Sequence, residues 1–141
     1  MKHRNNGNCE KCREIFSEYP LQTYFLFDWF VEFQLMFPEF HISEAGRGRV
    51  KQAAYLERKA SLAKYGESAH NYHAAIDTFV MLPEANTIYP RHWYYNILEP
   101  RLPAFLNWYG ARGAKFPELP HIEIRNWKEM VKNGELKLVE E

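Results

Sequence analysis

The sequence predicts an α+β fold in which helices flank a small antiparallel sheet. Residues 24–37 have the apolar spacing of a buried helix, whereas residues 74–81 and 121–124 have the composition or the alternation of strands. No linker rich in proline, glycine or serine interrupts the 141 residues. A chain of this length can bury a sizeable core, so we expect one domain spanning residues 1–141.

The first half of the chain supplies most of the predicted helices. Residues 15–19 have apolar side chains at helical spacing, and a proline ends this short helix because proline cannot continue one. Residues 24–37 follow as a longer, largely buried helix that also ends at a proline. Residues 41–44 have the pattern of a short strand, and a glycine-rich turn then leads into a helix over about residues 50–64.

Residues 74–81 combine small, β-branched and bulky apolar side chains, which favours a buried strand. Asp77 then lies among apolar neighbours. A buried carboxylate without a partner is unfavourable by several kcal/mol, so a cation beside Asp77 would resolve the conflict. A hydrogen-bonded structural aspartate is the alternative interpretation.

The last third of the chain predicts two helices and one strand. Two prolines fit the first turn of a helix over about residues 100–109. Residues 121–124 alternate as a strand does, which places His121 and Glu123 on the same face. A last helix ends at Gly134.

Charge and hydropathy exclude some partners. Eighteen basic residues balance eighteen acidic ones, so the sequence predicts neither nucleic-acid binding nor attraction to an anionic membrane. No apolar run approaches the roughly 18 residues of a membrane span. The basic first residues are followed by Asn5, Asn6, Gly7 and Asn8 where a secretory signal would be apolar, so we expect no signal peptide and a cytoplasmic location.

The only two cysteines, Cys9 and Cys12, lie three positions apart. A zinc ribbon or knuckle would need a second pair of ligands nearby. We therefore expect two reduced, structural cysteines.

Two fragments carry residues suited to a catalytic zinc. The first contains His70 and Asp77, and the second contains Glu118 and His121. A hydrolytic zinc needs three protein ligands and one open position for water. Two imidazoles and one aspartate meet that requirement, and Glu118 remains as a candidate base.

The same residues form a recognisable pattern. Residues 68–77 fit S-x-H-x4-A-x-D, and Glu-x-x-His follows near a predicted strand. The pattern resembles that of the zinc peptidases that include D-alanyl-D-alanine carboxypeptidases and dipeptidases and the L-alanyl-D-glutamate endopeptidases of phage endolysins. The fold of these peptidases in turn resembles the hedgehog signalling domain. The resemblance spans roughly residues 43–124 and implies a hedgehog/DD-peptidase-like fold.

By this resemblance, each family role falls on a residue of this chain. Zn2+ would be held by His70, Asp77 and His121. Glu118 would be the catalytic acidic residue, and Arg47 would address the substrate. The family often has a glutamine five residues after that arginine, where this chain has Gln52; the candidate substrate-binding residues are Ser68, Gln52 and His73.

His73 departs from the family pattern, and Glu123 has two possible interpretations. His73 stands where many members have glycine, and it could alter substrate access or act as a fourth ligand. Glu123 could orient a ligand histidine or be a solvated surface residue. In the implied mechanism, the metal polarises a water molecule and the scissile carbonyl, Glu118 transfers the proton, and Arg47 stabilises oxyanion charge or grips a substrate carboxylate.

The resemblance leads to three functional hypotheses. The first is a phage or prophage endolysin, a monomer that hydrolyses the L-alanyl-D-glutamate bond of peptidoglycan stem peptides and reaches the wall from the host cytoplasm with the help of a holin. The second is a D-alanyl-D-alanine carboxypeptidase or dipeptidase. The third is a non-catalytic, zinc-stabilised binding domain or virion structural domain, against which the presence of Glu118 argues.

Overall fold

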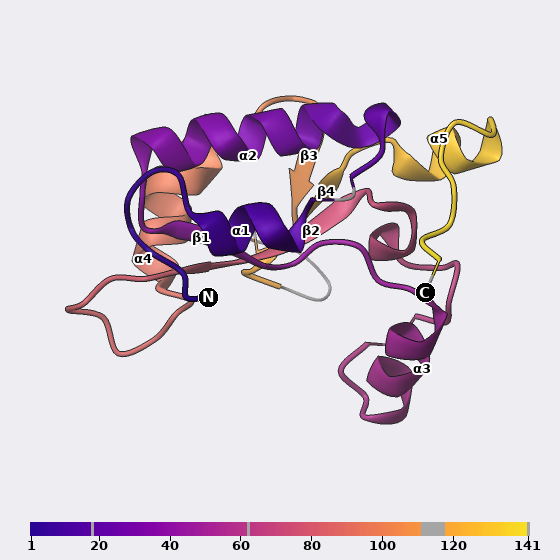
Figure 1. The fold of residues 1–141 in the computed structure, drawn as a ribbon, viewed down its shortest axis with the longest axis horizontal. Coiled ribbons are helices and arrows are strands. Elements are labelled where there is room, and N and C mark those ends of the chain that lie inside the picture. Colours follow the sequence, from indigo (N-terminus) through magenta and orange to yellow (C-terminus); the bar gives the residue numbers. More distant parts are fainter. Residues whose placement is uncertain (18, 62, 111–117, 141) are drawn as a thin grey trace.

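The computed structural model describes residues 1–17, 19–61, 63–110 and 118–140. Its helices are α1 (Glu10–Ile15), α2 (Tyr24–Met36), α3 (Arg49–Glu57), α4 (Arg91–Trp93) and α5 (Trp127–Lys132). Its strands are β1 (Phe40–Glu44), β2 (Ala75–Val80), β3 (Leu106–Trp108) and β4 (His121–Ile124). Short helical turns complete the structure: η1 (Leu21–Thr23), η2 (Ala69–Tyr72), η3 (Tyr94–Leu98) and η4 (Glu99–Arg101). Figure 1 shows the strands between α2 on one side and α3 on the other.

The four strands form one antiparallel sheet in the order β1-β2-β4-β3. This arrangement confirms the predicted fold class. The pairing of β1 with β2 is regular from Phe40 to Ile42 and then shifts, so that Glu44 lies opposite Asp77. Ser43 is the extra residue of this bulge.

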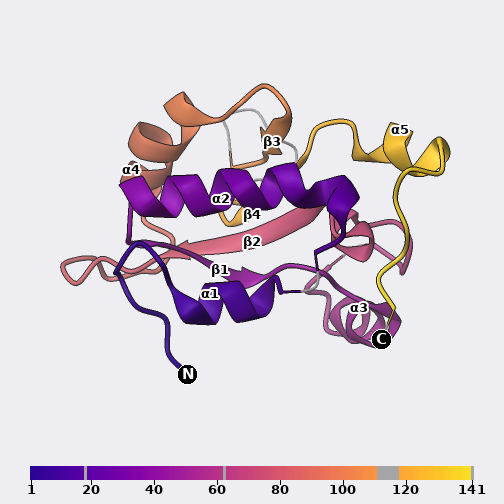
Figure 2. The same cartoon turned by 45° about the horizontal axis from the view of Figure 1, so that its top comes forward.

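One face of the sheet packs against α2 (Figure 2). Phe40 of β1 lies between two phenylalanines of this helix, with ring centroids 5.4 Å from Phe30 and 5.0 Å from Phe33, and it stacks on Trp93. Ile76 and Ile122, which are paired across β2 and β4, are also fully buried. The helical spacing of α2 and the alternation of the strands together create this core.

The opposite face of the sheet carries polar side chains. His41, Asp77, His121 and Glu123 alternate along their strands with the core residues, and Glu44 joins them through the bulge. The polar face is therefore where chemistry can take place.

The C-terminal segment returns to the region before β2. The backbone N–H of Val139 donates to the carbonyl of Asn71 at 2.6 Å, and the hydroxyl of Tyr65 donates to the carbonyl of Val139 at 2.8 Å. This contact fixes η2 from outside. Within the described ranges, no helix combines the length and the apolarity needed to cross a membrane.

The predicted helix over residues 100–109 is wrong. Only η4 is helical there, and Leu102 is extended because the residue before a proline disfavours helical backbone angles. Residues 106–108 form β3, which pairs with β4. The helix predicted over 50–64 also ends early, at Glu57, and Lys59 then has a positive φ of 60°.

Candidate active site

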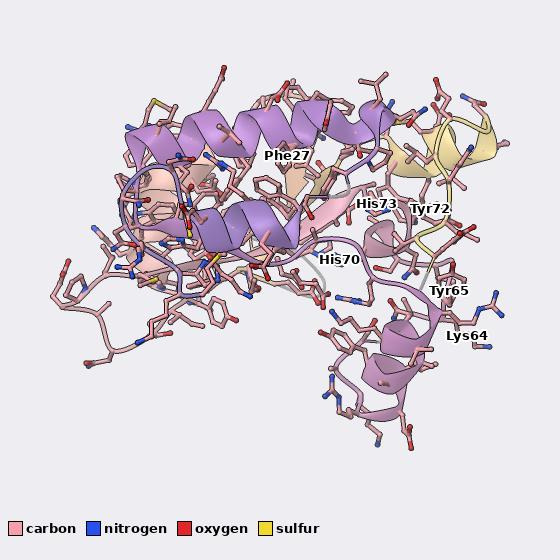
Figure 3. The ribbon with its side chains drawn as sticks, in the orientation of Figure 1. Phe27, Lys64, Tyr65, His70, Tyr72 and His73 are labelled. Carbon is pink, nitrogen blue, oxygen red and sulfur yellow. The ribbon has the colours of Figure 1, made fainter. Side chains whose placement is uncertain are left out.

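The register of the sheet brings together two of the predicted metal ligands. Asp77 of β2 lies directly opposite His121 of β4. His70 comes from η2, between the sheet and α3 (Figure 3). The three side chains form a group whose ligand atoms all lie within 4.8 Å of one another.

All three facing atoms are hydrogen-bond acceptors. Nε2 of His70 lies 3.2 Å from Oδ1 of Asp77, and Nδ1 of His121 lies 3.4 Å from the same oxygen. The other ring nitrogen of each histidine faces an acceptor: Nδ1 of His70 donates to the carbonyl of Ala45 at 2.8 Å, and Nε2 of His121 donates to Glu123 at 2.7 Å. In the neutral histidines, the proton is therefore on the nitrogen that faces away from Asp77. Three acceptors that meet at one point require a positive charge between them.

The distances fit a zinc ion. Zinc bonds to nitrogen and oxygen are about 2.0–2.2 Å long, so two such ligands of a tetrahedral ion are about 3.4 Å apart. The two distances to Asp77 Oδ1 are close to this value. The donor set of the structure therefore fits the metal that the sequence pattern implies.

The electrostatics of the three side chains also favours a positive charge between them. Burial opposes the ionisation of Asp77, but the imidazoles of His70 and His121 outweigh burial and lower its pKa well below the usual range. Burial likewise opposes a charge on His121, yet hydrogen bonds with Asp77 and Glu123 raise its pKa to about 9. The site binds a proton strongly when no other cation is present.

Glu123 orients His121. Its carboxylate is buried and accepts three hydrogen bonds: from His121, from the indole N–H of Trp127 at 2.7 Å and from the hydroxyl of Tyr109 at 3.2 Å. Carboxylates in this position fix the tautomer of a ligand histidine and raise its basicity. Of the two interpretations left open for Glu123, its burial excludes a solvated surface residue, and its bond to His121 favours the orienting role.

Ser68 holds the turn that carries His70. Its hydroxyl accepts from the backbone N–H of His70 at 3.3 Å, and Asn71 completes a capping box with it. The side-chain amide of Asn71 also donates to the carbonyl of Arg47 at 2.9 Å. Ser68 therefore supports His70, and it also lines the cavity above the three predicted ligands.

Arg47 is buried beside Asp77. Its Nε donates to Oε1 of Glu44 at 2.8 Å, and Nη2 donates to the same oxygen. Nη1 donates to Oε1 of Gln52 at 3.1 Å, and Nη2 lies 3.7 Å from Oδ2 of Asp77. The ring of Tyr55 packs against the guanidinium, 4.3 Å away.

Gln52 has a supporting place in this network. Its side chain is fully buried, accepts from Arg47 and Asn71, and donates to the carbonyl of Ala63 at 2.7 Å. It does not line the cavity. Gln52 therefore holds Arg47 from behind the cavity.

A cavity of about 500 Å3 opens over the three ligand atoms. The predicted site residues that line it are Arg47, Ser68, His70, Asp77, Glu118 and His121. Glu118 is 57% exposed, and its carboxylate lies 3.9 Å from Nδ1 of His121. It is close enough to share a water molecule with the histidine without a direct hydrogen bond.

Comparison with known proteins shows a likeness to a solved structure. Neither a protein-family model nor a curated protein matches the chain. Among solved structures, the crystal structure of Serratia marcescens L-Ala D-Glu endopeptidase ChiX superimposes with a TM-score of 0.61 and 16% sequence identity, over 85% of this chain and 90% of that one. The chain has the fold of this endopeptidase.

His73 lies outside the cavity, although this fold brings the other predicted residues to the cavity or to its supporting network. It faces a separate hollow lined by Tyr19, Gly46 and Val139, among others. Its φ of 55° is left-handed, a conformation that glycine adopts without strain. The glycine that many members of the resembling family have here thus has a backbone explanation.

Sequence reasoning missed Glu44 and Asn71. Glu44 reaches Arg47 only because of the bulge at Ser43, and bulges have no reliable sequence signal. Asn71 follows His70 directly, and the Ser-x-x-Asn spacing from Ser68 could have suggested a capping role.

Proposed function

We propose that this protein is a zinc-dependent peptidoglycan peptidase that hydrolyses the L-alanyl-D-glutamate bond of stem peptides, as a phage or prophage endolysin. The convergence of three acceptor atoms at the floor of a cavity carries the proposal, and the fold shared with an L-Ala D-Glu endopeptidase supports it. We propose further that the chain acts as one monomeric domain and stays in the host cytoplasm until a holin-type release.

His70, Asp77 and His121 would hold the zinc. When bound, zinc supplies a Lewis acid beside the scissile carbonyl and the attacking water. In the neutral imidazoles, the hydrogen bonds to Ala45 and Glu123 keep the proton on the outer nitrogen, so the facing nitrogens could bind the metal in place of a proton. Asp77 remains a carboxylate because the imidazoles favour its charged form.

Glu118 would accept the proton of the attacking water and return it to the departing amine. Its carboxylate lines the cavity next to His121 and is solvent-accessible, so both water and a peptide can reach it. A carboxylate within reach of one water molecule is a suitable general base.

Arg47 would bind negative charge on the substrate or on the oxyanion. A guanidinium has five N–H groups, and three of them are used by Glu44 and Gln52. These bonds hold the group rigidly and leave one N–H on each terminal nitrogen. Arg47 lines the cavity with Asp77 3.7 Å from Nη2, so among the described residues the N–H of Nη1 would be the first to meet a peptide there.

Mass spectrometry of digested peptidoglycan tests this proposal. Zinc-loaded protein should leave glycan that ends in L-alanine and release peptides that begin with D-glutamate, and a chelator should abolish both products. Loss of terminal D-alanine would instead identify a carboxypeptidase, and the absence of any metal-dependent product would identify a binding domain.

Replacing Glu118 separates catalysis from binding. Glu118→Gln should bind zinc as the wild type does and lose turnover by at least about 100-fold, as expected for a general base. Glu67→Gln, at an exposed glutamate outside the cavity, is the control and should retain both properties. Equal wall lysis by the Glu118→Gln variant and the wild type would contradict the assigned role.

A further inference from the structure

We propose that His3, Cys9, Cys12 and His41 form a second metal site, a closed structural zinc site of the Cys2His2 type. Their ligand atoms lie within 4.8 Å of one another. The group is separate from the active-site cavity, whose lining contains none of these residues. Two reduced cysteines were expected from the sequence; the structure adds the second ligand pair that a zinc site needs.

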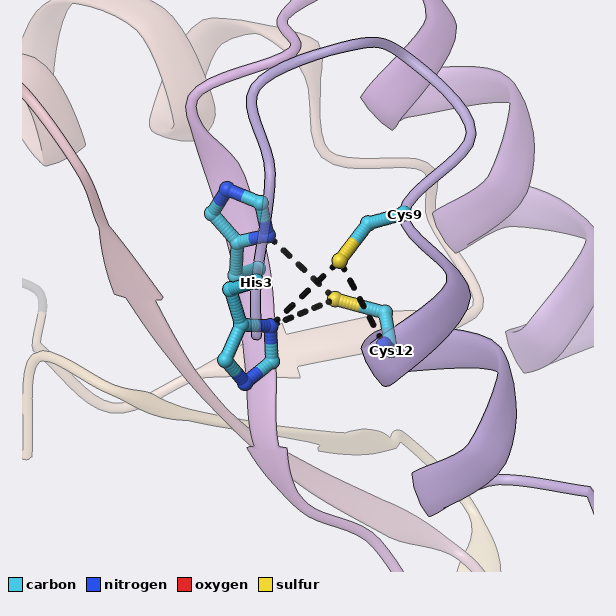
Figure 4. Close-up of side chains that lie close together, drawn as sticks. His3, Cys9 and Cys12 are labelled. Atoms are coloured by element: carbon cyan, nitrogen blue, oxygen red, sulfur yellow. Dashed lines mark hydrogen bonds between the residues drawn. The ribbon is translucent and has the colours of Figure 1, made fainter. Parts of the chain in front are cut away.

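The sulfur and nitrogen atoms are spaced as the ligands of a tetrahedral zinc ion would be. With zinc bonds of about 2.3 Å to sulfur and 2.0–2.1 Å to nitrogen, an S···N edge is about 3.5 Å long. Nδ1 of His3 lies 3.5 Å from Sγ of Cys9 and 3.4 Å from Sγ of Cys12 (Figure 4). Nδ1 of His41 lies 3.4 Å from Sγ of Cys12.

The nitrogen of His41 that faces the sulfur is available to a metal. Its Nε2 lies 2.7 Å from Oδ1 of Asn5, and the amide of Asn5 is oriented by donating to the carbonyl of Met81 at 2.8 Å. Nε2 of His41 is therefore the donor, and Nδ1 carries the lone pair, which the amide of Gln34 approaches at 3.5 Å. A hydrogen bond of this kind on the outer nitrogen is typical of metal-bound histidines.

Both sulfurs accept hydrogen bonds that suit thiolates. The backbone N–H of Cys12 donates to Sγ of Cys9 at 3.4 Å. Sγ of Cys12 accepts from the backbone N–H of Ile42 at 3.4 Å and from the side chain of Gln34 at 3.5 Å. Donors directed at sulfur stabilise its negative charge, and zinc binds the deprotonated form.

The site would fasten the N-terminal segment to the edge of the sheet. Cys9, Cys12 and His41 are fully buried. Together with His3 they make four ligands, which leave no open position for a substrate. In the described structure, β1 is an outer strand of the sheet, and α1 covers its edge through the Cys12 contact with Ile42. A metal there would hold α1, β1 and the residues before Cys9 together.

Cobalt substitution and metal counting test the proposal. The metal-free protein is titrated with Co2+, and thiolate-to-cobalt charge-transfer absorption together with the visible bands of tetrahedral Co2+ is expected. Zinc-loaded wild type should contain two zinc ions per chain, and the Cys9→Ser/Cys12→Ser variant should contain one and lack the charge-transfer absorption. His3→Ala is the milder variant, because His3 is only half-buried; it should weaken binding at this site at least about 10-fold.

Two controls separate this proposal from the proposed function. His92→Ala, at an exposed histidine, should keep both ions. Asp77→Asn should lose the ion at the cavity and keep the thiolate-to-cobalt absorption, whether or not the protein is a peptidase. A wild type that shows no such absorption, with thiols that react equally fast with and without zinc, would overturn the proposal, as would a disulfide between Cys9 and Cys12 in protein purified in the presence of a reductant.

Discussion

At the scale of single residues, the sequence identified the side chains that face the cavity better than the hydrogen-bonding partners that orient those side chains. His70, Asp77 and His121 were predicted from their types and spacing, and the structure brings them together. Their hydrogen-bonding partners were not predictable in the same way. Ala45 acts through its carbonyl, which every residue has, and the role of Glu123 depends on burial that its alternation alone does not reveal.

Replacing Glu123 should weaken zinc binding at the cavity, although Glu123 is not one of the three predicted ligands. Glu123→Gln removes the negative charge that fixes His121, so zinc affinity at the cavity should fall by about 10- to 100-fold. Competition against a chromophoric chelator measures the change. Glu129→Gln, an exposed change on α5, serves as the matched control, and equal affinities for the two variants would contradict the orienting role.

His73 offers a test of backbone strain. At a φ of 55°, glycine is more favourable than alanine by about 1 kcal/mol. Urea denaturation should therefore show His73→Gly to be more stable than His73→Ala by this amount, although both lose the ring contact with Tyr19. If alanine were as stable as glycine, the left-handed conformation would not be strained.

At the scale of elements, local pattern predicted β1, β2, β4 and α2 closely. The short helix predicted over residues 15–19 is wrong, because α1 ends at Ile15, and the pattern also failed where tertiary pairing decides. Residues 106–108 became a strand because Leu106 and Trp108 pair with β4, an interaction that no local pattern contains. The register of β2 and β4 is equally non-local, yet it sets Asp77 opposite His121. A slip by one residue would turn one ligand to the core face.

The bulge in β1 gives a prediction of its own. Glu44→Gln leaves Arg47 buried without the charge of its main partner, so the free energy of unfolding should fall by about 3 kcal/mol. Turnover should fall as well, because Arg47 is no longer held in place. Chemical denaturation of the zinc-loaded protein measures the first effect; a loss below about 1 kcal/mol would show that Asp77 and solvent compensate for the lost negative charge.

At the scale of the whole molecule, distant segments converge on η2. Val139 contacts Asn71 and Tyr65 through its backbone, and its side chain is nearly buried. Tyr72 packs against Trp127 of α5, with ring centroids 5.8 Å apart. The turn that carries His70 is thus fixed by the end of the chain, a relation that the weakly patterned tail did not predict.

Removing residues 137–141 should test that relation. The truncated protein should melt at a lower temperature and bind zinc more weakly at the cavity, because η2 loses an external support. Val139→Ala keeps the backbone hydrogen bonds and should have the smaller effect on both quantities. Calorimetry and zinc titration measure both quantities, and equal effects of the two changes would assign the support to the side chain of Val139 and contradict the role of its backbone hydrogen bonds.

The cluster of His3, Cys9, Cys12 and His41 is synthesised before the residues of the cavity are complete. Its four side chains occupy positions 3 to 41, whereas the cavity needs His121 from β4, the last strand made. During synthesis, the ribosome has therefore made every member of the cluster while the predicted ligands at the cavity are still incomplete. The N-terminal segment, α1 and β1 can therefore assemble before β2 and β4, which contain Asp77 and His121, are complete.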